Sequence, residues 1–373
     1  MFVPVSRPII DESDAQAVFN AVKRGDVSGL GGLELNEFEG KFAKFCGASF
    51  GVATTSCYTA LHLAMATLGI GKGDEVLVST YTNISTALPV LYLGAKPVFI
   101  DIEKDTFNIN PKLIEGKINS KTKAIVVVHI YGHSVDMDPI LKIAKKHKLL
   151  VIEDVAEALG GEYKGKLLGS LGDAGCFSFL ANKFITTGEG GMVVFKDSTL
   201  NSRARILRSL AFGKENRFMH EDFGFNYRMS NILAALGLSQ LKKVNKIIGK
   251  KRSIAKFYLK SFKNIKGFQL PVEREYAKNV YWMFHIVLTG ELEGKKKELM
   301  LKLKEAGVDT RDGFVPMNRQ KIFIQKGLCK ENDCPVANKI SENSFYIPSG
   351  PDISEEELKF VAKKVKEVVS KIV

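Results

Sequence analysis

Residues 124–154, AIVVVHIYGHSVDMDPILKIAKKHKLLVIED, contain two short apolar runs separated by an amphipathic segment. The runs 124–128 and 149–152 are apolar throughout, which is typical of strands that are buried on both faces. The segment 138–147 between them spaces its apolar residues as a helix does. A strand, a helix and a second strand in this order indicate a parallel sheet covered by helices.

The same alternation continues on both sides of this stretch. Toward the N-terminus we expect strands at 75–78 and 97–100 and helices at 11–24, 58–68, 84–94 and 111–117. Past residue 183 the pattern predicts a tight turn at 188–191, a long or broken helix over 230–262, a strand at 282–288 and helices at 293–306 and 354–371. We therefore predict an α/β protein with a large domain over residues 1–250 and a small α+β domain over 251–373.

The composition sets limits on the class of protein. With 373 residues, of which 45% are hydrophobic, the chain is long enough for two to three globular domains. The five cysteines are scattered and only Cys329 and Cys334 lie close together, so we expect reduced thiols and no metal site. The uncharged stretch 76–95 is rich in hydroxyl groups, and residues 1–7 lack a signal pattern. We expect a cytoplasmic protein that does not cross a membrane.

The charge is strongly positive, with 54 Lys and Arg against 41 Asp and Glu and a formal net charge of +13. Such a charge permits nucleic acid, anionic lipid or phosphorylated metabolites as partners. The basic residues are mixed with acidic ones over most of the chain, so we expect lysine-rich solvated faces. A regulatory or nucleic-acid-binding protein is the remote alternative to an enzyme.

Three segments next to expected strands carry groups that suggest chemistry. Asp154 follows the strand 149–152 and Glu157 lies three residues further on. A carboxylate at a buried strand end needs a cation or a donor, and a protonated pyridine nitrogen would serve. The alternative is that Asp154 caps a helix.

The second segment is FSFLANK, residues 177–183, followed by the glycine-rich turn 188–191. Lys183 stands among apolar and small residues, where desolvation lowers the pKa of an amine and makes it a nucleophile toward an aldehyde. The alternative is a surface lysine that enters a hairpin.

The third segment is TTSCYT, residues 54–59, at the start of the helix 58–68. Free backbone N–H groups at a helix N-terminus and nearby hydroxyls, including that of Ser56, suit a phosphate. The alternative is a plain helix cap. Together the three segments suggest pyridoxal 5′-phosphate (PLP), which needs a lysine, an acidic partner for its ring nitrogen and an anion site. Their order fits the aspartate-aminotransferase-like fold, PLP fold type I.

Three motifs resemble those of the DegT/DnrJ-type sugar aminotransferases: VIEDVAEALG at 151–160, GDAGCFSFLANKFITTGEGGMVV at 172–194 and FNYRMSNILAALGLSQL at 225–241. Within that family the chain is most similar to members that aminate C4 of nucleotide-linked 4-keto-6-deoxy sugars for surface polysaccharides such as lipopolysaccharide O-antigen. Family members that act as dehydratases carry His in place of the lysine, so Lys183 favours transamination.

The resemblance implies a role for each matching residue. Lys183 binds the cofactor covalently and moves the proton, and Asp154 pairs with the pyridinium nitrogen. The amides of Cys57 and Tyr58, the hydroxyl of Ser178 and Asn226 of the neighbouring subunit hold the phosphate. Three further residues are then expected near the cofactor: Ser56, Glu157 near the ring or the sugar, and Asn83 where the family often has a stacking aromatic residue.

The implied partners are a nucleotide-linked keto sugar, L-glutamate as amino donor, and a second copy of the chain in a homodimer with shared sites, which could pair into a tetramer. Amination at C3 is the alternative within the family. The sequence leaves two points open. Tyr81 is an alternative stacking residue, and His129 and His133 are either structural or in contact with the site.

Overall fold

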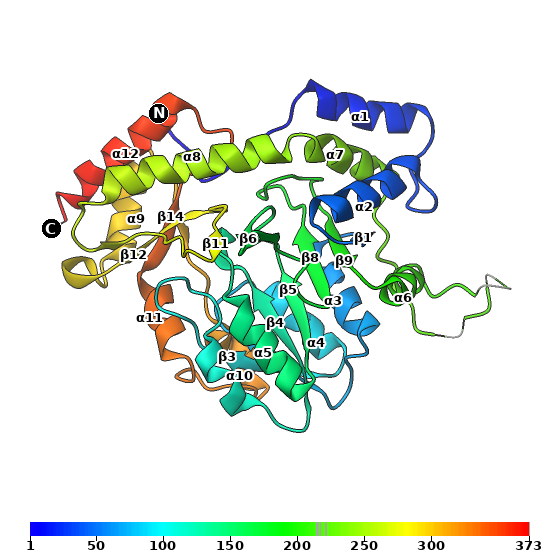
Figure 1. Ribbon diagram of the computed structural model, residues 1–373. Helices are drawn as coiled ribbons and strands as arrows, with labels where there is room; N and C mark the ends of the chain where they lie inside the picture. Colours follow the sequence, from blue (N-terminus) through cyan, green and yellow to red (C-terminus); the bar gives the residue numbers. More distant parts are fainter. Residues whose placement is uncertain (214–215, 217, 221, 373) are drawn as a thin grey trace.

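The computed structural model describes residues 1–213, 216, 218–220 and 222–372 (Figure 1). Within these residues seven strands form one sheet in the order β1-β9-β8-β5-β4-β2-β3. The neighbours from β8 to β3 pair in parallel, and β9 is antiparallel to both β1 and β8. The strands are β1 Phe50–Thr54, β2 Glu75–Ser79, β3 Lys96–Ile100, β4 Thr122–Val128, β5 Leu150–Asp154, β8 Ala174–Ser178 and β9 Gly191–Phe195. This mostly parallel sheet confirms the predicted fold class.

Helices cover both faces of the sheet. They are α2 Leu33–Phe45, α3 Cys57–Thr67, α4 Leu88–Tyr92, α5 Met137–His147, α6 Ser198–Arg208 and α7 Asn231–Leu241, whereas α1 Glu12–Lys23 packs on α7. In Figure 1, α5 lies in front of the sheet and α3 and α4 lie behind it. The connections from β1 to β2 and from β2 to β3 move along the sheet in one direction, and the connection from β4 to β5 moves in the other. Because crossover connections are right-handed, opposite directions place their helices on opposite faces.

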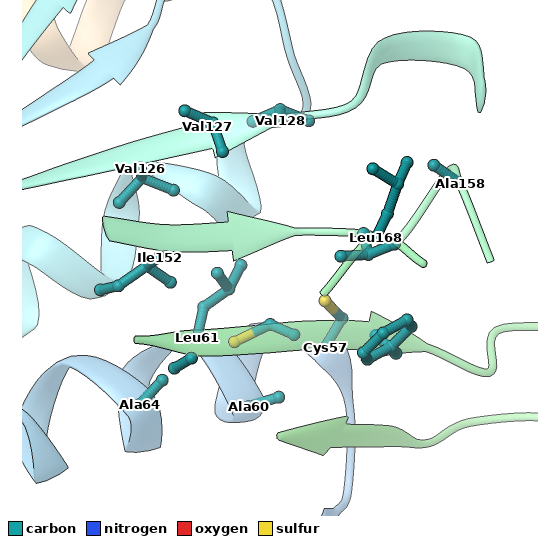
Figure 2. Close-up of a cluster of buried hydrophobic side chains, with 14 of the residues drawn as sticks. Cys57, Ala60, Leu61, Ala64, Val126, Val127, Val128, Ile152, Ala158 and Leu168 are labelled. Carbon is teal, nitrogen blue, oxygen red and sulfur yellow. The ribbon is translucent and has the colours of Figure 1, made fainter. Parts of the chain in front are cut away.

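Helix α3 is buried along most of its length, because it packs behind the centre of the sheet. Its small and apolar side chains allow a close approach to the strands. Figure 2 shows Ala60, Leu61 and Ala64 of this helix beside the strands that carry Val126 and Ile152. These residues are fully buried, so the start of α3 is held rigidly against the sheet.

A second, antiparallel sheet lies in the C-terminal part, in the order β10-β12-β14-β13. Its strands are β10 Phe268–Gln269, β12 Phe284–Leu288, β13 Arg311–Asp312 and β14 Ser344–Ile347, and a small sheet joins β11 Ala277–Lys278, β6 Glu162–Tyr163 and β7 Lys166–Leu167. The helices here are α8 Val244–Phe262, α9 Lys296–Glu305, α10 Lys321–Gln325, α11 Pro335–Asn343 and α12 Glu355–Val369. Figure 1 shows α8 extending from α7 to this second sheet.

The long helix α8 contributes to two hydrophobic clusters. Its residues Ile247 and Ile248 pack in the cluster of the large sheet, while Ile254 and Tyr258 pack in the C-terminal cluster. The N-terminal residue Val3 also packs in the C-terminal cluster. The division of the chain at residue 250 into two domains stays a prediction.

Some expected elements differ in detail. The helix expected at 111–117 is two short 3-10 helices, Pro111–Leu113 and Glu115–Lys117, because Gly116 favours helix poorly and the segment is too short to compensate. Likewise 84–94 divides into a 3-10 helix at Ile84–Thr86 and α4. The segment 230–262 is broken into α7 and α8, and the strand expected at 282–288 begins at Phe284.

Candidate active site

The three predicted segments meet at one edge of the large sheet. Strand β9 is antiparallel to both β1 and β8, so β1 and β8 run in the same direction, and β5 is parallel to β8. Their carboxyl ends therefore share one edge, where ligands of α/β proteins bind. A cavity of about 280 Å³ lies there. Its lining includes eight of the nine predicted site residues: Ser56, Cys57, Tyr58, Asn83, Asp154, Glu157, Ser178 and Lys183.

Asp154 is the last residue of β5 and is 4% exposed. Strand β5 ends two residues later than expected because the backbone of Asp154 pairs with both β4 and β8. The hydroxyl of Thr86 donates to Asp154 Oδ2 at 2.8 Å, and the amide of Ala156 donates to Oδ1 at 3.1 Å. Burial raises the pKa of this carboxyl. A cation bound in the cavity would hold it in its charged form.

The preceding residue, Glu153, serves the fold. The amides of Leu171 and Gly172 each donate to its Oε1 at 2.7 Å, and Oε2 accepts from the amide of Gly169 at 2.8 Å and lies 3.2 Å from His129 Nε2. Burial alone would raise the pKa of Glu153, but these donors hold it below its usual value. Adjacent carboxylates on opposite faces of β5 therefore have different environments.

Lys183 follows β8 in a tight loop and is half-buried. Its Nζ lies 3.6 Å from the ring centre of Trp282, which is far away in the sequence. Burial lowers the pKa of Lys183, while Glu157, Cys57 and Asp154 act in the opposite direction. A lysine of lowered pKa supplies a neutral, nucleophilic amine more readily.

Glu157 is 3% exposed and lies near the lysine. Its Oε2 accepts a hydrogen bond from the amide of Tyr131 at 2.8 Å. Burial raises the pKa of Glu157 to about 7, although the charge of Lys183 opposes the shift. The side chain can therefore gain or lose a proton near neutral pH.

The start of α3 is arranged to receive an anion. Ser56 is the N-cap: its hydroxyl accepts from the amide of Thr59 at 3.2 Å, and the Thr59 hydroxyl accepts from the Ser56 amide at 3.0 Å. The amides of Cys57 and Tyr58 lie in the first turn, where N–H groups lack acceptors within the helix. A side chain at Gly191 would collide with the carbonyl of Ser56 and come within 2.6 Å of the Cys57 amide, so glycine is needed beside this turn.

Ser178 and Asn83 line the cavity, whereas Tyr81 does not belong to its described lining. Ser178 lies at the end of β8, and its Oγ accepts from the amide of Leu180 at 3.4 Å. Asn83 is exposed at the cavity and accepts from the amide of Ser85 at 2.9 Å, which caps a 3-10 helix. Tyr81 is fully buried, and its hydroxyl lies 2.9 Å from Ser344 Oγ. Tyr81 is absent from the described lining of the cavity, so a stacking role for it finds no support.

Asn226 does not join the other predicted residues. It is exposed, forms a bridge with Ser209, and lies outside the described lining of the cavity. A contribution from a neighbouring subunit stays a prediction.

The two histidines have structural partners. His129 Nδ1 accepts from the amide of Val135 at 3.1 Å, so its Nε2 donates to Glu153. His133 Nδ1 donates to the carbonyl of Ser134 at 2.7 Å, and its Nε2 accepts from the amide of Arg274 at 3.1 Å. Both nitrogens of each ring are thus used within the fold.

Two aromatic residues of the cavity were not predicted, Trp282 and Phe314. Both residues lie more than 90 positions beyond Lys183, in the C-terminal part, and no local pattern links them to the lysine. Only the tertiary structure brings them to this edge of the sheet.

The residues of the cavity fit PLP. The carboxyl of Asp154 is buried, and none of the described residues forms a salt bridge with it. Lys183 and the first residues of α3 line the same cavity. These are the acid, the amine and the anion site that the cofactor requires.

The described part of the chain holds neither a metal-binding cluster nor a membrane-spanning helix. No three His, Cys, Asp or Glu side chains of this part of the chain lie together as a metal site would need. No helix there has both the length and the apolar character needed to span a bilayer.

Comparison with known proteins places this architecture in a family. Residues 8–366 match the model of the DegT/DnrJ/EryC1/StrS aminotransferase family, so the chain belongs to that family. The family is PLP-dependent, and the chain is a sugar aminotransferase.

Individual relatives cover the whole length. The chain is 37% identical to GDP-perosamine synthase of Escherichia coli O157:H7, with 99% of each chain covered. It is 35% identical to the spore coat polysaccharide biosynthesis protein SpsC of Bacillus subtilis, over 99% of this chain and 97% of SpsC. Among solved structures, the aminotransferase from Psychrobacter cryohalolentis is 32% identical and superposes with a TM-score of 0.92 over 100% of both chains.

Proposed function

We propose that this aminotransferase converts a nucleotide-linked 4-keto-6-deoxy sugar to the 4-amino sugar, with L-glutamate as the amino donor, in the synthesis of a surface polysaccharide. The observation that carries the proposal is the meeting of Asp154, Lys183 and the N-terminus of α3 around one cavity. The choice of C4 and of a nucleotide sugar rests on the full-length similarity to GDP-perosamine synthase.

When bound, PLP supplies an electron sink that lets an amino group leave a donor and enter a keto sugar. The residues of the chain bind the cofactor and move protons. The carboxylate of Asp154 would hold a proton on the ring nitrogen. The amides of Cys57 and Tyr58, with the Ser178 hydroxyl, would bind the phosphate.

Lys183 would bind the cofactor through Nζ and, once displaced, carry a proton between the cofactor carbon and the carbon of the bound substrate, which is the donor in the first half-reaction and the sugar in the second. Its lowered pKa keeps more of the amine neutral for this transfer. Glu157, with a pKa of about 7, is placed to hold a proton beside Lys183. Ser56 positions the phosphate-binding turn as its cap, and Asn83 lies at the open side of the cavity, where a sugar would enter.

We further propose that the enzyme is a cytoplasmic homodimer in which Asn226 of one subunit completes the phosphate site of the other. The position of Asn226 outside the cavity of its own subunit is compatible with this arrangement.

Absorbance spectroscopy and product analysis test the proposal. We expect the protein loaded with PLP to lose its visible band when L-glutamate is added and to regain it with the keto sugar, as ping-pong kinetics requires. Lys183→Ala should remove the borohydride-reducible adduct and lower kcat by more than about 1000-fold. Lys164→Ala, which changes an exposed lysine paired with Asp138, is the matched control.

The product distinguishes the alternatives. Nuclear magnetic resonance of the amino sugar should place nitrogen at C4, and nitrogen at C3 would replace the proposal with the C3 reaction. An unchanged band after addition of glutamate would contradict the donor. GDP- and dTDP-linked keto sugars, offered separately, identify the nucleotide.

A further inference from the structure

Trp282 is the only tryptophan of the chain, and the structure holds it against the candidate catalytic lysine. The lysine Nζ lies 3.6 Å from the centre of the indole ring, within the range of a cation–π contact. The indole N–H also donates to the carbonyl of Asn182 at 2.9 Å. Trp282 therefore contacts both the amine of Lys183 and the peptide unit that precedes this residue.

The indole ring is itself fixed by the fold. The backbone amide of Trp282 donates to the carbonyl of Tyr131 at 2.9 Å, and the indole ring stacks on the ring of Tyr131 with an interplanar angle of 22°. The close approach of these two backbone segments needs glycine at position 132, because a Cβ on Gly132 would lie 2.7 Å from the Tyr281 amide and 2.9 Å from the Trp282 amide. Trp282 is 6% exposed, so its ring has little freedom to move.

Other groups around Lys183 do not restrain its position in this way. Asp154, Glu157 and Cys57 act on it through charge, and no salt bridge to Lys183 occurs among the described residues. The amide of Lys183 donates to the carbonyl of Leu180 at 2.9 Å, within its own loop. A restraint from outside the loop comes from Trp282.

We propose that Trp282 is a positioning residue: its ring face holds the Lys183 amine at the cavity, and its N–H fixes the loop that carries this lysine. The inference rests on the proposed function of Lys183, because positioning matters only if this amine bears the cofactor. It links the C-terminal part, which contributes Trp282, to the reaction at the large sheet.

Labelling of the cofactor-free protein tests the ring contact. The rate at which acetic anhydride modifies Lys183, followed by mass spectrometry over a pH series, gives the pKa of its amine. Because the indole face favours the ammonium form, Trp282→Leu should lower this pKa by about one unit. Trp282→Phe keeps a ring and should shift it less. Phe314→Leu, which removes another ring of the same cavity, should not shift it.

Fluorescence of the wild-type protein is the second measurement, and it does not depend on the stability of a Trp282 variant. Because the chain has one tryptophan, its emission reports on this site alone. The emission should change with pH at the midpoint found by labelling, and Lys183→Met should abolish that transition. An emission without this transition, or a folded Trp282→Leu protein with an unchanged pKa of Lys183, would overturn the inference.

The proposed function fails in a different way. If borohydride reduction after addition of PLP attaches the label to another lysine, Lys183 is not the cofactor residue, whatever the fluorescence shows. If the label is on Lys183 but either the labelling or the emission fails to respond as expected, only the role of Trp282 is lost.

Discussion

At the scale of single residues, the carboxylates of Glu153 and Asp154 show how one strand serves both the fold and the site. Their side chains point to opposite faces of β5, as alternation in a strand requires. Glu153 accepts from three backbone amides and contacts His129, whereas Asp154 faces the cavity with fewer donors. The sequence shows two neighbouring acids, and only their surroundings separate their roles.

We predict opposite phenotypes for the two amide variants. Asp154→Asn should keep the fold and lower kcat by about 100-fold or more, because the ring nitrogen loses its negative partner. Glu153→Gln should destabilise the fold by about 2–4 kcal/mol, because an NH₂ group would then face a backbone donor. Thermal unfolding and steady-state kinetics of both variants check this, and equal losses of stability would contradict it.

The buried His285 predicts a pH dependence of stability. Its ring packs against those of Phe107 and Tyr131, and burial lowers its pKa to about 3 from an ordinary value of about 6.5. Between pH 6.5 and 3, the imidazole of His285 therefore binds a proton in the unfolded chain but stays neutral in the folded chain. The contribution of His285 to the free energy of unfolding is fully present above pH 6.5. It decreases by about 1.4 kcal/mol per pH unit as the pH falls toward 3.

His285→Phe removes this proton uptake. Between pH 6.5 and 5 the free energy of unfolding should fall less steeply in the variant than in the wild type, by about 1.4 kcal/mol per pH unit. Urea unfolding at several pH values measures both slopes. Parallel slopes would show that His285 takes up its proton in the folded protein.

At the scale of elements, the cavity depends on how the turn before α3 packs against β9. The capping box of Ser56 and Thr59 fixes the start of the helix, and Gly191 lets β9 approach it. The sequence predicted the helix over 58–68 and the glycine-rich turn separately. It could not show that the two touch, because they are more than 120 residues apart.

We predict that Gly191→Ala weakens PLP binding by at least about tenfold, because the new Cβ would displace the Ser56 carbonyl and the Cys57 amide. Gly40→Ala is the matched control: this exposed glycine lies within α2 with open space around its Cα, and the change should stabilise the protein by about 0.5–1 kcal/mol. Equilibrium titration with PLP gives the affinities. Wild-type affinity in Gly191→Ala would rule out the close approach.

At the scale of the whole molecule, the chain joins a large mostly parallel sheet to a smaller antiparallel one through α8 (Figure 1). The N-terminal segment also reaches the C-terminal part, where Arg7 pairs with Asp352 and Glu357. Residues from both parts line the cavity, since Trp282 and Phe314 lie beyond α8. The site therefore forms only when both parts have folded together.

A hybrid dimer tests whether two subunits share each site. One subunit carries Lys183→Ala and the other Asn226→Asp, with different affinity tags for purification of the mixed species. If Asn226 serves the partner's cavity, one of the two sites contains both wild-type residues, and the hybrid should have about half the wild-type activity. Both parent homodimers should be nearly inactive, and a hybrid as inactive as its parents would contradict the shared site.

The sequence by itself determined the alternation of strands and helices, the mostly parallel sheet, and the acid, the amine and the helix start at its edge. These features are local, because hydrophobic periodicity and short motifs act over a few residues. Only the tertiary structure decided that Glu153 serves the fold, that Tyr81 is buried away from the cavity, and that Trp282 lies on Lys183. Such contacts join residues up to 263 positions apart, as for Tyr81 and Ser344, and they arise from packing between elements, which no local pattern records.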